Sequence, residues 1–167
     1  MSLAYDAMMF AREAHKMQRR KYTNNPYTDH LAEVAGIVAT VDNSAESVAT
    51  AWLHDCREDQ DVTGEEIEHR FGIRVAVGVS LLSDFERGNR ATRKAASCDR
   101  LANAPGWVQT IKCADIISNT VSIVQHDPTF ATVYLEEKRA LLAVLTNADP
   151  RLLALAQMQA CGVVGAA

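Results

Sequence analysis

A stretch of six residues, His54 to Asp59, carries one imidazole and three carboxylates directly after an apolar segment. Residues four apart share one face of a helix, so a helical stretch places His54 beside Glu58 and Asp55 beside Asp59. Buried groups of this kind are costly unless they pair with bases or hold a cation. We interpret the stretch as a metal site, in which His54 and Asp55 bind a divalent ion and Glu58 and Asp59 remain for proton transfer.

Two further residues of metal-ligating type stand elsewhere in the chain. His30 comes just before an apolar helical run, and Asp115 interrupts an apolar stretch that should be buried. Each also has a simpler interpretation, as a capping or core histidine and as part of a structural salt bridge. With His54 and Asp55 they make a set of two imidazoles and two carboxylates. Such a set suits manganese, iron, cobalt or zinc better than calcium, and the ion would polarise a phosphoryl oxygen.

Basic side chains are the second requirement of phosphoryl chemistry, because negative charge must be stabilised. Two basic pairs are candidates, Arg20-Lys21 and Arg93-Lys94. A solvated surface is the simpler interpretation of each pair. We expect His15 to lie on a polar, solvated helix face.

The elements that position these residues are predicted to be helices almost throughout. Apolar residues recur at helical spacing, and only 4 prolines and 8 glycines interrupt the chain. Thr63 opens a segment with the form of a capping box. The predicted helices cover about 3–18, 28–41, 45–57, 64–71, 73–82, 107–125, 131–145 and 151–159, with a loop leading into a helix over 84–100.

Composition narrows the class of protein. The chain has 167 residues, of which 48% are hydrophobic and 23% are charged, as in one ordinary globular domain. Its formal net charge of −4 argues against general nucleic-acid binding. No apolar run approaches the length of a membrane span, and the 4 cysteines form no CxxC pair. We expect a soluble, cytoplasmic protein with reduced thiols.

Four segments, in order, form a more specific pattern. They are Gln18-Arg19-Arg20-Lys21 followed by Pro26-Tyr27-x-x-His30, then Ala51-Trp52-Leu53-His54-Asp55-x-x-Glu58-Asp59, then Phe71-Gly72 with Val75-Ala76, and Ile111-Lys112-Cys113-Ala114-Asp115-x-x-x-Asn119. The set resembles the HD-domain metal-dependent phosphohydrolases. More narrowly, it resembles the hydrolase domain of the RelA/SpoT proteins and the small alarmone hydrolases of the Mesh1 type. The resemblance spans about residues 5–125.

This resemblance implies an all-α fold, an HD-domain bundle of about eight to ten helices in a single domain over 1–167. It implies one metal ion, usually Mn²⁺, and removal of the 3′-pyrophosphate of guanosine tetra- or pentaphosphate to give GDP or GTP. The implied roles are metal binding for His30, His54, Asp55 and Asp115, activation of the attacking water for Glu58 and Asp59, and nucleotide contacts for Arg20, Lys21, Asn119 and Ser122.

Gln60 departs from the resembled pattern, which has threonine there, and this bears on the orientation of its neighbours. Two alternatives stay open. One is an HD phosphohydrolase acting on another nucleotide, such as an adenine alarmone, NADPH or a nucleoside monophosphate. The other is a non-catalytic, nucleotide-binding regulatory module. The expected partner is a small nucleotide, with no nucleic acid and no membrane, and a homodimer is left open. No synthesis activity is expected from a chain of this length.

Overall fold

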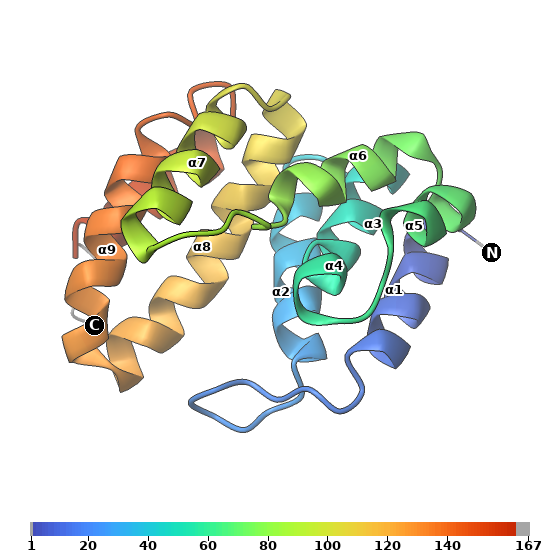
Figure 1. The fold of residues 1–167 in the computed structure, drawn as a ribbon, viewed down its shortest axis with the longest axis horizontal. Coiled ribbons are helices and arrows are strands. Elements are labelled where there is room, and N and C mark those ends of the chain that lie inside the picture. The colour runs from blue at the N-terminus through green and yellow to red at the C-terminus, as the bar shows by residue number, and fades with distance from the viewer. Residues whose placement is uncertain (1, 163–167) are drawn as a thin grey trace. The chain divides into compact units, whose positions relative to one another are not determined.

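A computed structural model of the protein describes residues 2–162, and these residues form ten α-helices (Figure 1). The helices are α1 (Leu3–Ala14), α2 (Thr28–Ala39), α3 (Ala45–Leu53), α4 (Cys56–Asp59), α5 (Gly64–Phe71), α6 (Ile73–Leu82), α7 (Arg90–Ala102), α8 (Gly106–His126), α9 (Pro128–Leu142) and α10 (Pro150–Ala160). Within this described range, strand pairing is limited to one isolated bridge between Arg19 and Pro26. The prediction of an all-α fold with about eight to ten helices is confirmed.

The chain divides into two compact units, an N-terminal unit over 1–85 and a C-terminal unit over 86–167. The N-terminal unit contains α1 to α6, and the C-terminal unit contains α7 to α10. Among the described helices, none combines the length and the apolarity that crossing a bilayer requires.

Helix α3 is the central helix of the N-terminal unit, because α1, α2 and α6 all pack against it. Its side chains Ala49 and Leu53 are fully buried, together with Leu31 of α2 and Val79 of α6. Burying an aliphatic side chain of this size contributes about 1.5–3 kcal/mol. The end of α3 is therefore held firmly by the core, and the His54-Asp55 pair follows it directly.

The predicted helix over 45–57 is wrong in one respect, because it is interrupted at residues 54 and 55. The ring Nδ1 of His54 lies 2.7 Å from the carbonyl oxygen of Ala51. The last carbonyls of a helix have no partner within it, and a side chain that bonds one of them competes with continuation of the helix. Helix α4 then begins with Cys56, whose buried side chain joins the core of the N-terminal unit.

In the C-terminal unit, α9 and α10 pack against the long helix α8, and α7 contacts both α8 and α9. Helix α8 begins at Gly106, a position where any side chain would collide with the backbone. A Cβ atom on Gly106 would lie 2.3 Å from the carbonyl oxygen of Asn147. Residues 90–102 form α7, which agrees with the predicted loop leading into a helix.

Candidate metal centre

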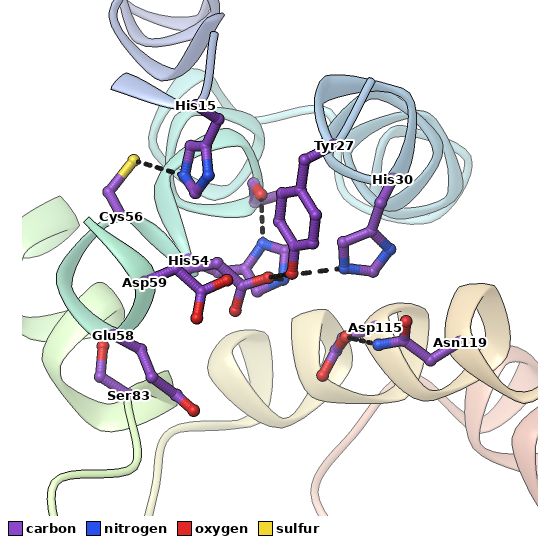
Figure 2. A network of polar contacts seen from close by, with 12 residues as sticks. His15, Tyr27, His30, His54, Cys56, Glu58, Asp59, Ser83, Asp115 and Asn119 are labelled. Atoms are coloured by element: carbon purple, nitrogen blue, oxygen red, sulfur yellow. Dashed lines mark hydrogen bonds and ion pairs between the residues drawn. The ribbon is translucent and has the colours of Figure 1, made fainter. Parts of the chain in front are cut away.

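Three predicted metal ligands meet at the helix ends of the N-terminal unit, and Figure 2 labels two of them, His30 and His54. His30 lies in the first turn of α2, His54 follows α3, and Asp55 precedes α4. The Nε2 atoms of His30 and His54 lie 3.6 Å and 3.1 Å from Oδ2 of Asp55. The two imidazoles also offer ring nitrogens within 4.8 Å of each other. Side chains 24 positions apart in sequence thus converge on one carboxylate oxygen.

The hydrogen bond of His54 determines which ring nitrogen faces this carboxylate as a possible ligand. A carbonyl oxygen only accepts, so Nδ1 must carry the proton that it donates to Ala51. A neutral ring then has its lone pair on Nε2, which faces Asp55 Oδ2. Two lone pairs 3.1 Å apart repel each other unless a proton or a metal cation lies between them. The donor set therefore fits a divalent metal ion, and an outward Nδ1 bond to the backbone is typical of ligating histidines.

Asp55 is held as a carboxylate. Burial by itself would raise the pKa of Asp55, but the positive charge of the protonated His54 ring and hydrogen bonds from His30 and His54 outweigh burial and hold this pKa well below its usual range. The hydroxyl of Tyr27 also donates a hydrogen bond of 2.5 Å to Oδ2 of Asp55. An ionised carboxylate is what a metal ligand requires, so the surroundings of Asp55 favour cation binding.

The predicted catalytic pair lies on α4, directly after Asp55, and both side chains are exposed. Each carboxylate accepts a hydrogen bond from outside the helix. The backbone N–H of Asp84 donates to Oε2 of Glu58 at 2.9 Å, and Nε2 of Gln18 donates to Oδ2 of Asp59 at 2.8 Å. The two carboxylates are therefore accessible to solvent but restrained in orientation.

The basic pair Arg20-Lys21 lies in the loop between α1 and α2, in the same unit as the two histidines. The loop is closed by the bridge between Arg19 and Pro26 and by a 2.8 Å hydrogen bond from the N–H of Arg20 to the carbonyl of Asn25. The ammonium of Lys21 lies 4.8 Å from the ring centre of its neighbour Tyr22. The loop presents Lys21 as an exposed cation on an ordered backbone.

Asp115 belongs to the C-terminal unit, where it is buried on α8. Its Oδ2 accepts from Nζ of Lys112 at 2.8 Å, and its Oδ1 accepts from Nδ2 of Asn119 at 2.7 Å. The structure thus contains the salt bridge that was the simpler interpretation of Asp115. Both contacts follow from helical spacing, since residues three and four apart share a face.

The remaining predicted nucleotide contacts also lie in the C-terminal unit. Ser122 is on α8, where its carbonyl oxygen accepts from Nδ1 of His126 at 2.8 Å. Arg93 and Lys94 are on α7, and the charge of Lys94 acts on Glu137 of α9.

One prediction about this region is wrong, because His15 is buried rather than solvated. Helix α1 ends at Ala14 instead of continuing to residue 18, and the ring of His15 stacks on Tyr27 with 5.2 Å between centroids. Sequence reasoning also missed Gln18 as a contributor to the site. Gln18 opens the segment Gln18-Arg19-Arg20-Lys21 that carries the resemblance, so a signal for it was present but was assigned to the basic residues alone.

The family model described as HD domain matches residues 7–125 of this chain. The chain belongs to the HD domain family. An HD domain implies a bound divalent metal ion, and the pair His54-Asp55 has the residue types after which the family is named.

Relatives of this HD domain are much longer proteins. A protein of Aquifex aeolicus named guanosine-3′,5′-bis(diphosphate) 3′-pyrophosphohydrolase is 34% identical over 140 residues, which cover 82% of this chain and 19% of the relative. A protein of Synechocystis sp., named as a probable enzyme of the same kind, is 31% identical over 147 residues, or 84% of this chain and 19% of the relative. The chain thus spans about a fifth of the length of these curated relatives.

Solved structures share the fold of this HD domain. A metazoan ortholog of SpoT, described as hydrolysing ppGpp, matches with a TM-score of 0.89 at 22% identity, over 98% of this chain and 97% of that chain. A Listeria monocytogenes protein matches with a TM-score of 0.70 at 20% identity, over 83% of this chain and 96% of that chain. These similarities agree with the all-helical architecture described above.

Proposed function

We propose that this HD domain is a metal-dependent nucleotide pyrophosphohydrolase. Its substrate is guanosine tetra- or pentaphosphate, from which it removes the 3′-pyrophosphate to give GDP or GTP and pyrophosphate. The observation that carries the proposal is the convergence of His30 and His54 on Asp55, with Glu58 and Asp59 on the next turn. The names of the Aquifex and Synechocystis relatives support the choice of nucleotide.

The proposed metal ligands are His30, His54, Asp55 and Asp115. Asp115 is included because its sequence segment lies within the residues that the HD family model matches. Hydrogen bonds from Lys112 and Asn119 hold its carboxylate, as outer partners commonly hold ligating carboxylates. We propose Mn²⁺ as the ion, with iron, cobalt and zinc as alternatives for the same mixed nitrogen and oxygen donors. When bound, the ion supplies Lewis-acid polarisation of a phosphoryl oxygen.

The proposed catalytic residues are Glu58 and Asp59, which position the attacking water and accept its proton. Their exposure leaves room for water and substrate, while the hydrogen bonds from Asp84 and Gln18 restrain them. General acid–base groups of this kind typically contribute about 10²–10⁴-fold to a rate. The proposed substrate contacts are Arg20, Lys21, Asn119, Ser122, Arg93 and Lys94.

We propose that the N-terminal and C-terminal units together act as one HD phosphohydrolase domain. In support, the family model runs from residue 7 to 125 and so continues through the boundary at residue 85. The four cysteines are free, which fits the reducing interior of a cell, and we place the protein in the cytoplasm. The expected partner is the nucleotide itself, and light scattering tests whether two copies associate.

The function is tested by incubating the purified protein, loaded with Mn²⁺, with guanosine tetraphosphate and following pyrophosphate release. We expect GDP and pyrophosphate in equal amounts, with no release after chelation by EDTA. The matched comparison is a panel containing an adenine alarmone, NADPH and a nucleoside monophosphate. Turnover of one of these instead would replace the proposed substrate while keeping the hydrolase. Binding without turnover of any of them, with metal confirmed bound, would contradict the hydrolase and favour a regulatory module.

A further inference from the structure

We propose that Gln18 is a positioning residue, which orients the carboxylate of Asp59 at the end of a chain of hydrogen bonds that begins at the buried thiol of Cys56. The chain also passes through His15 and is joined by Gln60, and all five residues belong to the N-terminal unit. The inference rests on the proposed function to the extent that it takes Asp59 as one of the catalytic pair.

The contact between Gln18 and Asp59 determines how the amide of Gln18 is oriented. Its Nε2 lies 2.8 Å from Oδ2 of Asp59, although the two residues are 41 positions apart in sequence. An ionised carboxylate only accepts hydrogen bonds, so the amide nitrogen must face Asp59 and the amide oxygen must face the other way.

The amide oxygen of Gln18 receives two contacts. Nδ1 of His15 lies 2.5 Å from it, and Nε2 of Gln60 lies 2.7 Å from it. Because this oxygen only accepts, Nδ1 of His15 must carry a proton. Nε2 of Gln60 also lies 3.3 Å from Nδ1 of His15, but both atoms carry protons and cannot form a hydrogen bond with each other. The Gln60 amide therefore donates to the amide oxygen of Gln18.

The tautomer of His15 extends the chain into the core. With its proton on Nδ1, a neutral ring can only accept at Nε2, which lies 3.5 Å from Sγ of Cys56 (Figure 2). Burial lowers the pKa of His15, which favours the neutral ring, so Nε2 accepts and the thiol of Cys56 donates. The directions are therefore consistent throughout: Cys56 donates to His15, His15 and Gln60 donate to Gln18, and Gln18 donates to Asp59.

These hydrogen bonds orient a carboxylate whose direction is not determined by its own helix. Asp59 is the exposed last residue of the four-residue helix α4, and its backbone alone leaves the side chain several rotamers. His15 is buried and stacked on Tyr27, so its end of the chain is rigid. Gln18 thus links the side chain of Asp59 to the buried ring of His15. Loss of the hydrogen bond between Gln18 and Asp59 should therefore affect the catalytic step more than substrate or metal binding.

Turnover of Mn²⁺-loaded Gln18→Leu, which keeps the size of the side chain and removes both amide groups, tests this role. We expect kcat to fall by about 10–100-fold, as for other outer partners of a reactive centre, with KM and bound Mn²⁺ unchanged. The matched control is Gln157→Leu, the same change at an exposed position on α10, which should retain the wild-type kcat. A loss of kcat equal in the two variants, or a change in KM alone, would overturn the inference.

A double-mutant cycle separates positioning from general loss of structure. In an Asp59→Ala background, whose residual turnover is followed with radiolabelled substrate, the acceptor is already gone. Gln18→Leu should then cost less than about twofold, because coupled residues give non-additive effects. An equal fold loss in both backgrounds would show that Gln18 acts without Asp59.

A measurement that does not depend on turnover tests the hydrogen bonds of Gln18 separately from the proposed function. The full protein is labelled with ¹⁵N-glutamine. The side-chain amide signal of Gln18 is assigned as the wild-type signal that is missing from the spectrum of Gln18→Leu. We expect this signal to move upfield in Asp59→Ala and to move again in Gln60→Leu, while the Gln157 signal stays in place. A Gln18 signal that ignores both substitutions refutes the chain, even in an active enzyme. A responsive signal in a protein that releases no pyrophosphate contradicts the proposed function alone.

Discussion

Replacing Asp55 with asparagine removes one negative charge from the candidate metal centre and leaves its shape almost unchanged. Oδ2 of Asp55 is the atom on which His30, His54 and Tyr27 converge, so this single substitution affects all three of these contacts. A neutral amide is a much poorer ligand for a divalent cation than a carboxylate. We therefore expect a large loss of metal-dependent stability.

The magnitude follows from binding linkage. Free metal at one hundred times its Kd stabilises the folded protein by about 2.7 kcal/mol. If Asp55→Asn raises the Kd for the metal about a hundredfold, the same metal concentration stabilises the folded variant by only about 0.4 kcal/mol. For a chain of this size 1 kcal/mol shifts Tm by about 2–4 °C, so the metal-dependent shift should fall from about 5–11 °C to about 1–2 °C.

The assay is thermal unfolding of each protein with Mn²⁺ and with EDTA, comparing the difference between the two conditions. The difference cancels any change in the stability of the metal-free protein. Such a change is expected because loss of the carboxylate also weakens its contacts with the two imidazoles. The matched control is Asp99→Asn on α7, an exposed position, which should keep the full shift. If Asp55→Asn also keeps the full shift, Asp55 does not bind the metal and the reasoning is refuted.

Three further predictions concern catalysis, packing and pH. Glu58→Gln should keep the metal-dependent Tm shift but lower kcat by about 10²–10⁴-fold, and an unchanged kcat would remove its assigned role. Gly106→Ala should lower the free energy of unfolding by at least about 1–3 kcal/mol in urea titrations, because its Cβ would lie 2.3 Å from the Asn147 carbonyl. The control Gly36→Ala in α2, which meets nothing within 4 Å, should be neutral or stabilising. Burial raises the pKa of Asp42, but hydrogen bonds from the following serines outweigh burial and lower it below its usual 3.8. The stability lost in Asp42→Asn should therefore be constant above about pH 5 and shrink as the pH falls below 4; an effect that grows on acidification would reverse the assigned sign.

Much of the helical architecture could be predicted because its signals are local. The predicted helices over 64–71 and 73–82 match α5 and α6, and the prediction over 107–125 differs from α8 by one residue at each end. Thr63 caps α5 as expected, accepting a hydrogen bond from the N–H of Glu66 at 3.1 Å. Caps and the spacing of apolar residues act within one or two turns, so the sequence alone expresses them.

The errors occurred where side chains from distant segments compete with local preference. The first helix was expected to reach residue 18, but it ends at Ala14, where His15 turns into the core and stacks on Tyr27. The third helix was expected to run through His54, but the bond from that ring to the Ala51 carbonyl interrupts it. Neither contact leaves a periodic pattern in the sequence, because each depends on a burial that only packing creates.

The sequence by itself determined the fold class and the inventory of chemical groups, since helical periodicity and the spacing from His54 to Asp59 are properties of neighbouring residues. Tertiary structure alone decided that His30 reaches Asp55, and that Gln18 reaches Asp59 across 41 positions. It also decided that His15 is buried rather than solvated, and this burial lowers the pKa of its ring. The reason is physical: hydrogen bonds and charges act over a few ångströms of space, and the distance along the chain does not reveal which groups come that close.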